Sequence, residues 1–367
     1  MKIGLNATCF NNRPSGAKQR FIGLYTRLFK LMPDAEFVIF QPSDCNLEDW
    51  FSEPNIRFSN TPIPSEGRIL KFIKGFNFWG PVLKKEKFDL FECFNIPTVK
   101  NKYGRTYQTI HDIRSLHFES SKLKKFFSIY AHNDTFKKAD KIITVSQTMQ
   151  SEILKHYPDA NVEFLYNGID LDVFSLNGAR DSFVLNAELA LPENFLLAVG
   201  HFEDRKNYDL LIDAIKHLKD TNSRQSLIIV GNDNGQKQRI ENKLLSLNLE
   251  KNIFLFSNLA DEEVQIMYRL CSAFIFPSTY EGFGIPVLEA MAYEKPFILS
   301  NIEVFKEITE NQGVYFEPLN VRSIAAAILK VCENPSISKK LQIYGKNRVK
   351  DFNFNFLAHA LKRLYMS

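Results

Sequence analysis

The chain is predicted to belong to the α/β class, with two doubly wound (Rossmann-like) domains facing across a cleft. Three observations support this prediction. Short apolar runs alternate with helical patterns in both halves, 367 residues exceed one typical core, and a polar, irregular stretch lies at 171–190. We therefore expect one domain over 1–180, a second over 181–350, and a final helix within 351–367.

The overall composition excludes several classes of protein. Hydrophobic residues make up 45% of the chain, charged residues 24%, and the net charge is only +4, so we expect no nucleic-acid partner. The five cysteines are scattered without metal-ligand or redox spacing, which is typical of a reducing compartment. We see neither a signal peptide nor a membrane span, and therefore expect a cytoplasmic protein.

The N-terminal half begins with strand, loop, helix and strand. A strand is expected at 2–7, a turn-rich loop at 11–17 containing Gly16, a helix at 21–32 and a strand at 36–40. No G-x-G-x-x-G pattern is present, which disfavours a nicotinamide oxidoreductase. Further strands are expected at 89–94, 105–110, 141–145 and 162–166, and the second of these ends at His111 and Asp112. Ligands of open α/β sheets bind at such strand ends, although a single histidine is often structural.

Residues 68–87 form a basic and aromatic segment with two interpretations. Apolar positions 69, 70, 72, 73 and 76 would share one face of a helix flanked by Lys71 and Lys74. Such a helix can lie on an anionic membrane surface. The alternative is a domain helix that covers a core with this face while its lysines extend to water.

The C-terminal half places two adjacent cations after a buried strand. The continuous apolar run at 194–200 predicts that strand, and Arg205 and Lys206 follow before a helix begins. Cations at a strand-to-helix junction can bind a diphosphate together with helix-start amides, whereas the alternative is a solvated charged loop. Strands at 226–230 and 252–256 continue the alternation.

The most specific pattern is the stretch from 271 to 292. It predicts a buried strand, a turn containing Gly282 and Gly284, and a helix with Pro286 in its first turn. Glu281 enters the turn, and Glu289 is expected in the first helical turn. Carboxylates there accept hydrogen bonds from vicinal hydroxyls of a sugar or ribose, but a lone acid near a helix start is often only a cap.

Two glutamates bracketing Gly-Phe-Gly-Ile-Pro resemble the motif of family 4 retaining glycosyltransferases of the GT-B fold. The resemblance covers nearly the whole chain, and it implies that the last helix returns to the N-terminal domain. In the family, His111 corresponds to a residue near the donor sugar, and Lys206 to a lysine that stabilises the leaving diphosphate. Arg205 corresponds to a nearby arginine, although His201 occupies the position where some members carry it. The N-terminal loop departs from the family, because Ser15-Gly16 stands where two glycines are usual.

This resemblance implies transfer of a hexosyl group from a nucleoside-diphosphate sugar to an acceptor hydroxyl, with retained anomeric configuration. Glu281 and the amides of the turn would bind donor-sugar hydroxyls, Glu289 the ribose, and Gly16 the diphosphate. The predicted catalytic residues are Glu281, Lys206, Arg205 and His111, and the donor-binding residues are Gly16, Gly282, Phe283, Gly284, Ile285 and Glu289. No metal and no cofactor are expected.

The substrates are predicted only by overall likeness. Likeness to mannosyltransferases of polysaccharide assembly favours GDP-mannose or a related deoxyhexose, with UDP-hexose as the alternative. The expected acceptor is a glycan or lipid-linked glycan in surface polysaccharide or lipopolysaccharide biosynthesis, at the inner face of the membrane if residues 68–87 touch it. Two other classes remain: a non-catalytic nucleotide-sugar-binding subunit, and a GT-B epimerase or phosphorylase.

Overall fold

The computed structural model describes residues 1–13, 15–94, 96–118, 121–174 and 191–367. The chain forms two compact units, one from Met1–Gly168 with Phe352–Ser367 and the other from Ile169–Asp351. The predicted boundary at 180 lies outside the described residues, and the division falls earlier, between 168 and 169. The last helix belongs to the first unit, as expected. Among the described residues, no helix combines the length and apolar character needed to cross a membrane.

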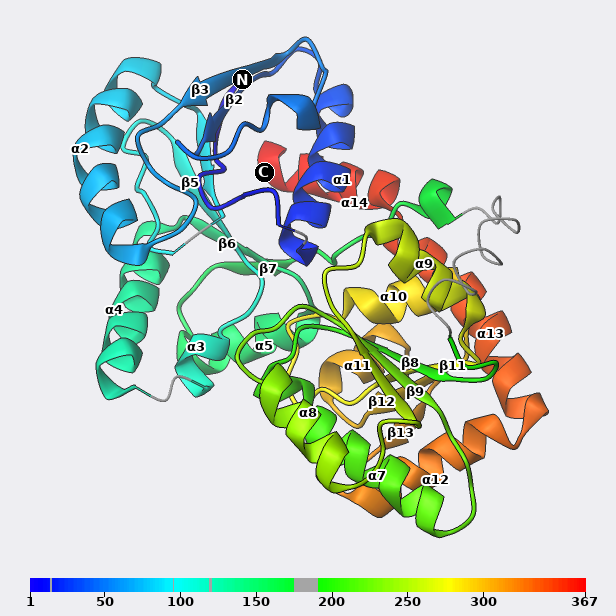
Figure 1. Ribbon diagram of the computed structural model, residues 1–367. Coiled ribbons are helices and arrows are strands. Elements are labelled where there is room, and N and C mark those ends of the chain that lie inside the picture. Colours follow the sequence, from blue (N-terminus) through cyan, green and yellow to red (C-terminus); the bar gives the residue numbers. More distant parts are fainter. Residues whose placement is uncertain (14, 95, 119–120, 175–190) are drawn as a thin grey trace. The chain divides into compact units, whose positions relative to one another are not determined.

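Unit 1 is a parallel sheet of seven strands covered by helices on both faces (Figure 1, blue to teal, with α14 in red). In sheet order the strands are β3 (Ile56–Asn60), β2 (Glu36–Gln41), β1 (Lys2–Asn6), β4 (Leu90–Cys93), β5 (Arg105–Ile110), β6 (Lys141–Thr144) and β7 (Val162–Phe164). The helices are α1 (Gly16–Leu31), α2 (Arg68–Glu86), α3 (Arg114–His117), α4 (Lys122–Lys138), α5 (Gln147–His156) and α14 (Phe354–Met366). The reversal of strand order at β1 is that of a doubly wound fold.

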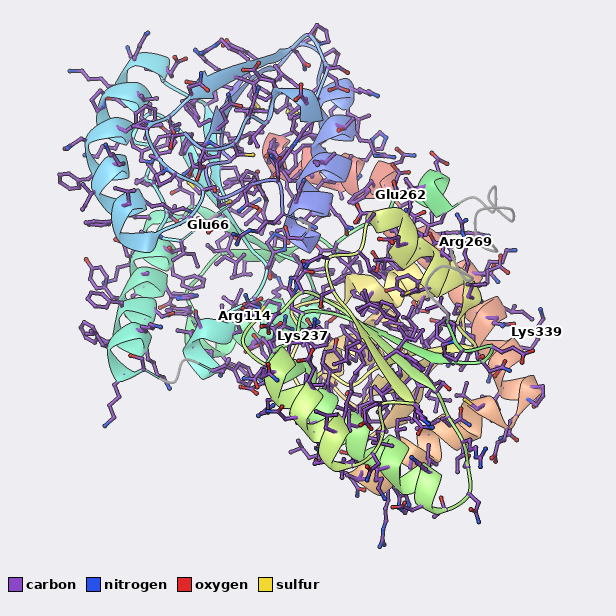
Figure 2. All side chains as sticks on the ribbon, viewed as in Figure 1. Glu66, Arg114, Lys237, Glu262, Arg269 and Lys339 are labelled. Carbon is purple, nitrogen blue, oxygen red and sulfur yellow. The ribbon has the colours of Figure 1, made fainter. Side chains whose placement is uncertain are left out.

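Unit 2 is a second parallel sheet with helices on both faces (Figure 1, green to orange). In sheet order the strands are β10 (Ile253–Phe256), β9 (Leu227–Val230), β8 (Leu196–Val199), β11 (Ala273–Phe276), β12 (Phe297–Ser300) and β13 (Val314–Phe316). The helices are α7 (Tyr208–Asp220), α8 (Lys237–Ser246), α9 (Asp261–Leu270), α10 (Ile285–Ala292), α11 (Glu303–Ile308), α12 (Val321–Cys332) and α13 (Pro335–Arg348). Short 3-10 turns lie at Glu48–Trp50, Leu171–Phe174, Asp204–Lys206 and Val349–Phe352. Figure 2 shows side chains filling the space between this sheet and its helices.

The last helix, α14, completes the core of unit 1 by packing on α1. Leu357, Leu361 and Tyr365 are buried in the same cluster as Leu24 and Leu28 of α1. The close approach requires Gly23, because a Cβ there would lie 2.2 Å from the Phe354 ring.

A buried carboxyl group joins α14 to the sheet. Glu92 of β4 is fully buried and accepts hydrogen bonds from Tyr25 (2.7 Å), Thr109 (2.5 Å) and Tyr365. Burial raises the pKa of Glu92 above its ordinary value, despite these hydrogen bonds and the charge of Arg20. The three hydroxyls thus surround a carboxyl group that binds its proton more strongly than an exposed glutamate does.

Glu92→Leu is expected to lower the free energy of unfolding of unit 1 by about 2–3 kcal/mol, because three buried hydroxyls lose their partner. Glu92→Gln keeps the shape and has a different signature. A raised pKa stabilises the fold below the pKa of the unfolded chain, and this stabilisation is lost as pH rises through the pKa of the folded state. The free energy of unfolding of Glu92→Gln should therefore increase relative to that of the native protein as pH rises. Urea unfolding followed by the fluorescence of Trp50 and Trp79 measures this, because both tryptophans lie in unit 1. A constant difference across pH would contradict it.

Candidate active site

The candidate site in unit 2 lies where two neighbouring strands end. β8 and β11 are parallel partners, with Leu196 opposite Ala273, so the loops that follow them leave the same edge of the sheet. The two loops are directly bonded. The Thr279 amide donates to the Arg205 carbonyl (2.8 Å), and the Arg205 guanidinium donates to the Tyr280 carbonyl (3.1 Å). Strand order thus brings together two segments that are far apart in the chain.

These loops carry a cluster of four charged side chains. Lys206 Nζ lies 2.7 Å from Glu281 Oε1, and Arg205 Nη1 lies 2.6 Å from Glu281 Oε2. Arg205 also reaches Glu203, with 2.5 Å between Nη2 and Oε1. The predicted residues Glu281, Lys206 and Arg205 are therefore close together, but their direct pairing was not expected, because Glu281 is assigned to the donor sugar and both cations to the leaving diphosphate.

The electrostatics of the cluster keep Glu281 ionised. Burial alone raises the pKa of the Glu281 carboxyl, but Lys206 and Arg205 outweigh it and lower that pKa to about 2. Burial lowers the pKa of Lys206, and pairing with Glu281 only partly opposes this effect. At neutral pH Glu281 is thus a carboxylate that accepts hydrogen bonds and does not donate a proton.

The position of Lys206 depends on Gly200 at the end of β8. A Cβ at Gly200 would lie 2.8 Å from Lys206 Cε and 3.1 Å from the Tyr208 hydroxyl. The Tyr208 hydroxyl donates to the Gly200 carbonyl (2.8 Å), and the Lys206 ammonium lies 4.5 Å from the centre of the Phe276 ring. Close contact with Gly200 and with the Phe276 ring thus holds the Lys206 ammonium group next to Glu281.

The glycine turn and α10 present the remaining predicted donor-binding residues. Gly282, Phe283 and Gly284 are buried, and Gly284 caps α10 at a φ of 134°, which favours glycine. Ile285 is the first helical residue and is half-buried. Glu289 lies in the second turn of α10, not in the first as expected, because the helix begins at Ile285.

Glu289 makes its own contact, separate from the lysine–arginine cluster. The Tyr268 hydroxyl on α9 donates to Glu289 Oε2 (2.8 Å). Burial raises the pKa of Glu289, and the charge of Asp261 raises it further, while the Tyr268 hydrogen bond opposes them. Arg269, labelled in Figure 2 at the end of α9, follows Tyr268 and lies over the Tyr293 ring at 5.7 Å.

Unit 1 carries the other two predicted residues. Gly16 begins α1 behind Ser15, whose hydroxyl accepts a hydrogen bond from the Lys18 amide (3.2 Å). His111 directly follows β5 and is half-buried. Burial lowers the pKa of His111 to about 3, with the charge of Arg20 acting in the same direction, so the imidazole is neutral at neutral pH.

Sequence reasoning missed three residues of these sites. Glu203 forms an ion pair with Arg205, and the Tyr268 hydroxyl donates a hydrogen bond to Glu289. Near the end of unit 1, Arg20 donates to the carbonyls of Leu165 (3.0 Å) and Tyr166 (2.5 Å). A signal existed for Glu203, because it stands in the same strand-end loop as Arg205 and Lys206. Tyr268 gave none, since its helical spacing looks like that of an ordinary core residue.

The fold and the site are those of the GT-B class of glycosyltransferases. The chain has two doubly wound units, a last helix that returns to the first unit, and a glycine turn between two glutamates in the second. Residues 34–173 match the model of glycosyltransferase family 4, and residues 181–348 match that of glycosyl transferases group 1. The chain belongs to family 4 of the glycosyltransferases.

Curated relatives are similar to this chain at modest identity. The O-antigen chain mannosyltransferase RfbU of Salmonella typhimurium is 28% identical over 64% of this chain and 63% of its own length. An uncharacterized glycosyltransferase of Methanocaldococcus jannaschii is 26% identical over 92% of both chains. The match with RfbU thus spans less than two thirds of that relative.

Solved structures share the fold over the whole chain. Sucrose-phosphate synthase from Thermosynechococcus elongatus has a TM-score of 0.78 at 20% identity, covering 100% of this chain and 98% of that one. HepE of Anabaena, solved in complex with UDP-glucose, has a TM-score of 0.74 at 18% identity, covering 100% and 99%.

Proposed function

We propose that this protein is a retaining glycosyltransferase that moves a hexosyl group from a nucleoside-diphosphate sugar to a glycan or lipid-linked glycan acceptor. The observation that carries this proposal is the ion cluster of Lys206, Arg205 and Glu281 at adjacent strand ends. Its cations suit a diphosphate leaving group, and its carboxylate suits the hydroxyls of the transferred sugar. Family membership and the mannosyltransferase relative support the same activity.

The proposed mechanism is electrostatic. As the glycosidic bond breaks, negative charge grows on the leaving diphosphate, and Lys206 and Arg205 stabilise it from a largely buried position. Both cations are held by carboxylates before the donor binds, so donor binding exchanges a carboxylate contact for a phosphate contact. Glu281 cannot serve as a general acid with a pKa of about 2, and we assign it to hydrogen bonds with donor-sugar hydroxyls.

Further residues are assigned to the nucleoside and to other parts of the donor. Glu289, oriented by Tyr268, would accept hydrogen bonds from the ribose hydroxyls. The assignments of His111 to the donor sugar and of Gly16 to the diphosphate remain predictions. A neutral His111 is suited to hydrogen bonding with a sugar hydroxyl, and not to charge stabilisation.

We propose GDP-mannose as the donor, in surface polysaccharide biosynthesis at the inner face of a membrane, with UDP-hexose as the alternative. The name of the Salmonella relative supports mannose, whereas the Anabaena structure contains UDP-glucose. The test incubates the full chain with GDP-, UDP- and ADP-sugars, with and without lipid-linked acceptors, and measures free nucleoside diphosphate and product. Acceptor-dependent release from GDP-mannose is expected.

Three outcomes of this experiment would overturn parts of the proposal. Binding of a nucleotide sugar without turnover with any acceptor indicates a non-catalytic subunit. Conversion of the donor without an acceptor, or only with inorganic phosphate, indicates an epimerase or a phosphorylase. Inverted configuration in the product, determined by NMR, removes the retaining mechanism.

A further inference from the structure

Helix α2 turns large apolar side chains toward solvent. Leu70, Phe72, Ile73 and Phe76 are 48%, 63%, 55% and 78% exposed, whereas Trp79 and Leu83 pack the helix on the sheet. The predicted apolar face of this helix is therefore present. The interpretation in which that face covers a core is wrong for these four residues, because they are exposed. Exposed apolar patches of this kind mark surfaces that meet a partner or a membrane.

Helix α4 shows the same property in a stronger form. Ordinary surface helices bury large apolar residues and expose polar ones. In α4 the buried residues are Ser128, His132 and Thr135. Its exposed apolar residues are Leu123 (66%), Phe126 (65%), Phe127 (58%), Ile129 (40%) and Tyr130 (65%). This polarity is reversed, which indicates that the outer face of α4 is adapted to apolar surroundings.

The two helices cover the same face of the sheet in unit 1. Alternate residues of a strand point to opposite faces. Phe91 and Cys93 of β4 point toward α2, since both pack with Trp79 and Leu83. Cys93 is paired with Gln108 of β5, so Gln108 points to that face as well, while Tyr107 packs in the cluster on the α1 side.

A short chain of hydrogen bonds then places α4 on this face. Thr98 donates from its hydroxyl to Gln108 (2.6 Å) and from its amide to the Thr135 hydroxyl of α4 (3.2 Å). In Figure 1 both helices lie at the left of unit 1, and in Figure 2 side chains project from them on that side. The exposed apolar residues of α2 and α4 thus belong to one outer layer.

The charge of this layer is positive. Exposed lysines accompany the apolar residues: Lys74, Lys84 and Lys85 on α2, and Lys122, Lys124 and Lys125 on α4. Each helix has a single acidic residue, and neither is exposed. Glu86 is bonded to Lys2 and Arg57, and Asp134 pairs with Lys138 (2.6 Å). Exposed aromatic residues beside exposed lysines match the interface of an anionic bilayer, which attracts lysines near its surface.

We propose that the outer faces of α2 and α4 form one docking surface for an anionic lipid bilayer. The surface, defined by Phe72, Phe76, Phe126 and Phe127 with the flanking lysines, inserts aromatic rings at headgroup depth while the lysines contact lipid phosphates. This inference adds α4 to the segment 68–87. It also stands apart from the catalytic proposal, since vesicle binding requires neither donor nor acceptor.

The test is sedimentation of the full chain with vesicles of phosphatidylcholine, with or without one third phosphatidylglycerol. The native protein should bind only the anionic vesicles, and added salt should weaken binding. The variants F72S/F76S and F126S/F127S should each lower the partition coefficient at least about tenfold, as should K124Q/K125Q. The control is Phe356→Ser on α14, which removes an equally exposed phenylalanine (69%) and should leave binding unchanged.

Several results would overturn the inference. They include no binding of the native protein to anionic vesicles, equal binding by native protein and both phenylalanine pairs, or an equal loss in the control. If analytical ultracentrifugation shows a dimer that both pairs dissociate, without vesicle binding, then a second copy of the chain covers this surface. Because all exchanged residues are exposed, unchanged tryptophan fluorescence serves as the check on folding.

Discussion

Replacing Lys206 with alanine is expected to lower the turnover number for the nucleotide-sugar donor at least about tenfold, or roughly 1.4 kcal/mol of transition-state stabilisation. The reason is that Lys206 is a largely buried ammonium group next to Arg205, where charge stabilisation is stronger than in water. Release of nucleoside diphosphate, measured over a range of donor concentrations, separates turnover from donor affinity. We expect turnover to fall more than affinity, because leaving-group charge develops in the transition state.

Lys219→Ala is the matched control for this experiment. Lys219 is an exposed lysine of the same unit, bonded to the Asn248 carbonyl at the far end of α7, and its loss should leave turnover unchanged. A folded Lys206→Ala variant with native turnover would remove Lys206 from the mechanism. An equal loss in the Lys219 variant would show that the effect is general and not local to the site.

Replacing Glu281 with alanine is expected to lower turnover at least about tenfold and also to destabilise unit 2 by about 3 kcal/mol. Arg205 keeps its contact with Glu203, but Lys206 loses the carboxylate with which it pairs and becomes an uncompensated cation in a largely buried place. Calorimetry is the appropriate measurement, because both tryptophans lie in unit 1 and do not follow the unfolding of unit 2.

The pH dependence and a double variant test the cause of this loss. A lowered pKa stabilises the fold above the ordinary carboxyl range, and this advantage disappears as pH falls toward about 2. The difference in the free energy of unfolding between the native protein and Glu281→Ala should therefore shrink as pH falls. Adding Lys206→Ala to Glu281→Ala should recover part of the stability, since the orphaned cation is removed. A double variant that is no more stable than Glu281→Ala alone would contradict the ion-pair explanation.

The spacing of Glu281 and Glu289 around two glycines identified the candidate site from sequence, because a glycine turn between a strand and a helix is a local pattern. The pairing of Glu281 with Lys206 was not predicted, since it depends on β8 and β11 being neighbours in the sheet. That strand order is a property of the whole fold. Local patterns specify which side chains stand at strand ends, but not which strand ends meet.

Element type was predictable wherever an apolar run was continuous, as in β8, β9 and β11, which are buried on both faces. β3 was missed, because Ile56–Asn60 lies at the edge of the sheet and alternates with polar residues. For α4 the sequence indicated only the end of a helix, at 134–139. A helix that turns its large apolar residues outward has the periodicity of a buried face, and the direction of that face is not encoded in the periodicity.

The return of α14 to unit 1 has a consequence for the order of events during synthesis. The rings of Tyr166 and Phe352 are in contact, with centres 5.3 Å apart, and a Cβ at Gly168 would lie 2.5 Å from the Phe354 ring. The segments on either side of unit 2 therefore meet within unit 1. Unit 2 is therefore an insertion in unit 1, and the chain leaves unit 1 and returns to it at the same place. A nascent chain must complete all of unit 2 before Leu357, Leu361 and Tyr365 emerge to close the first core. The unit that begins first on the ribosome is thus expected to finish folding last, and unit 2 is suited to transplantation as a self-contained cassette.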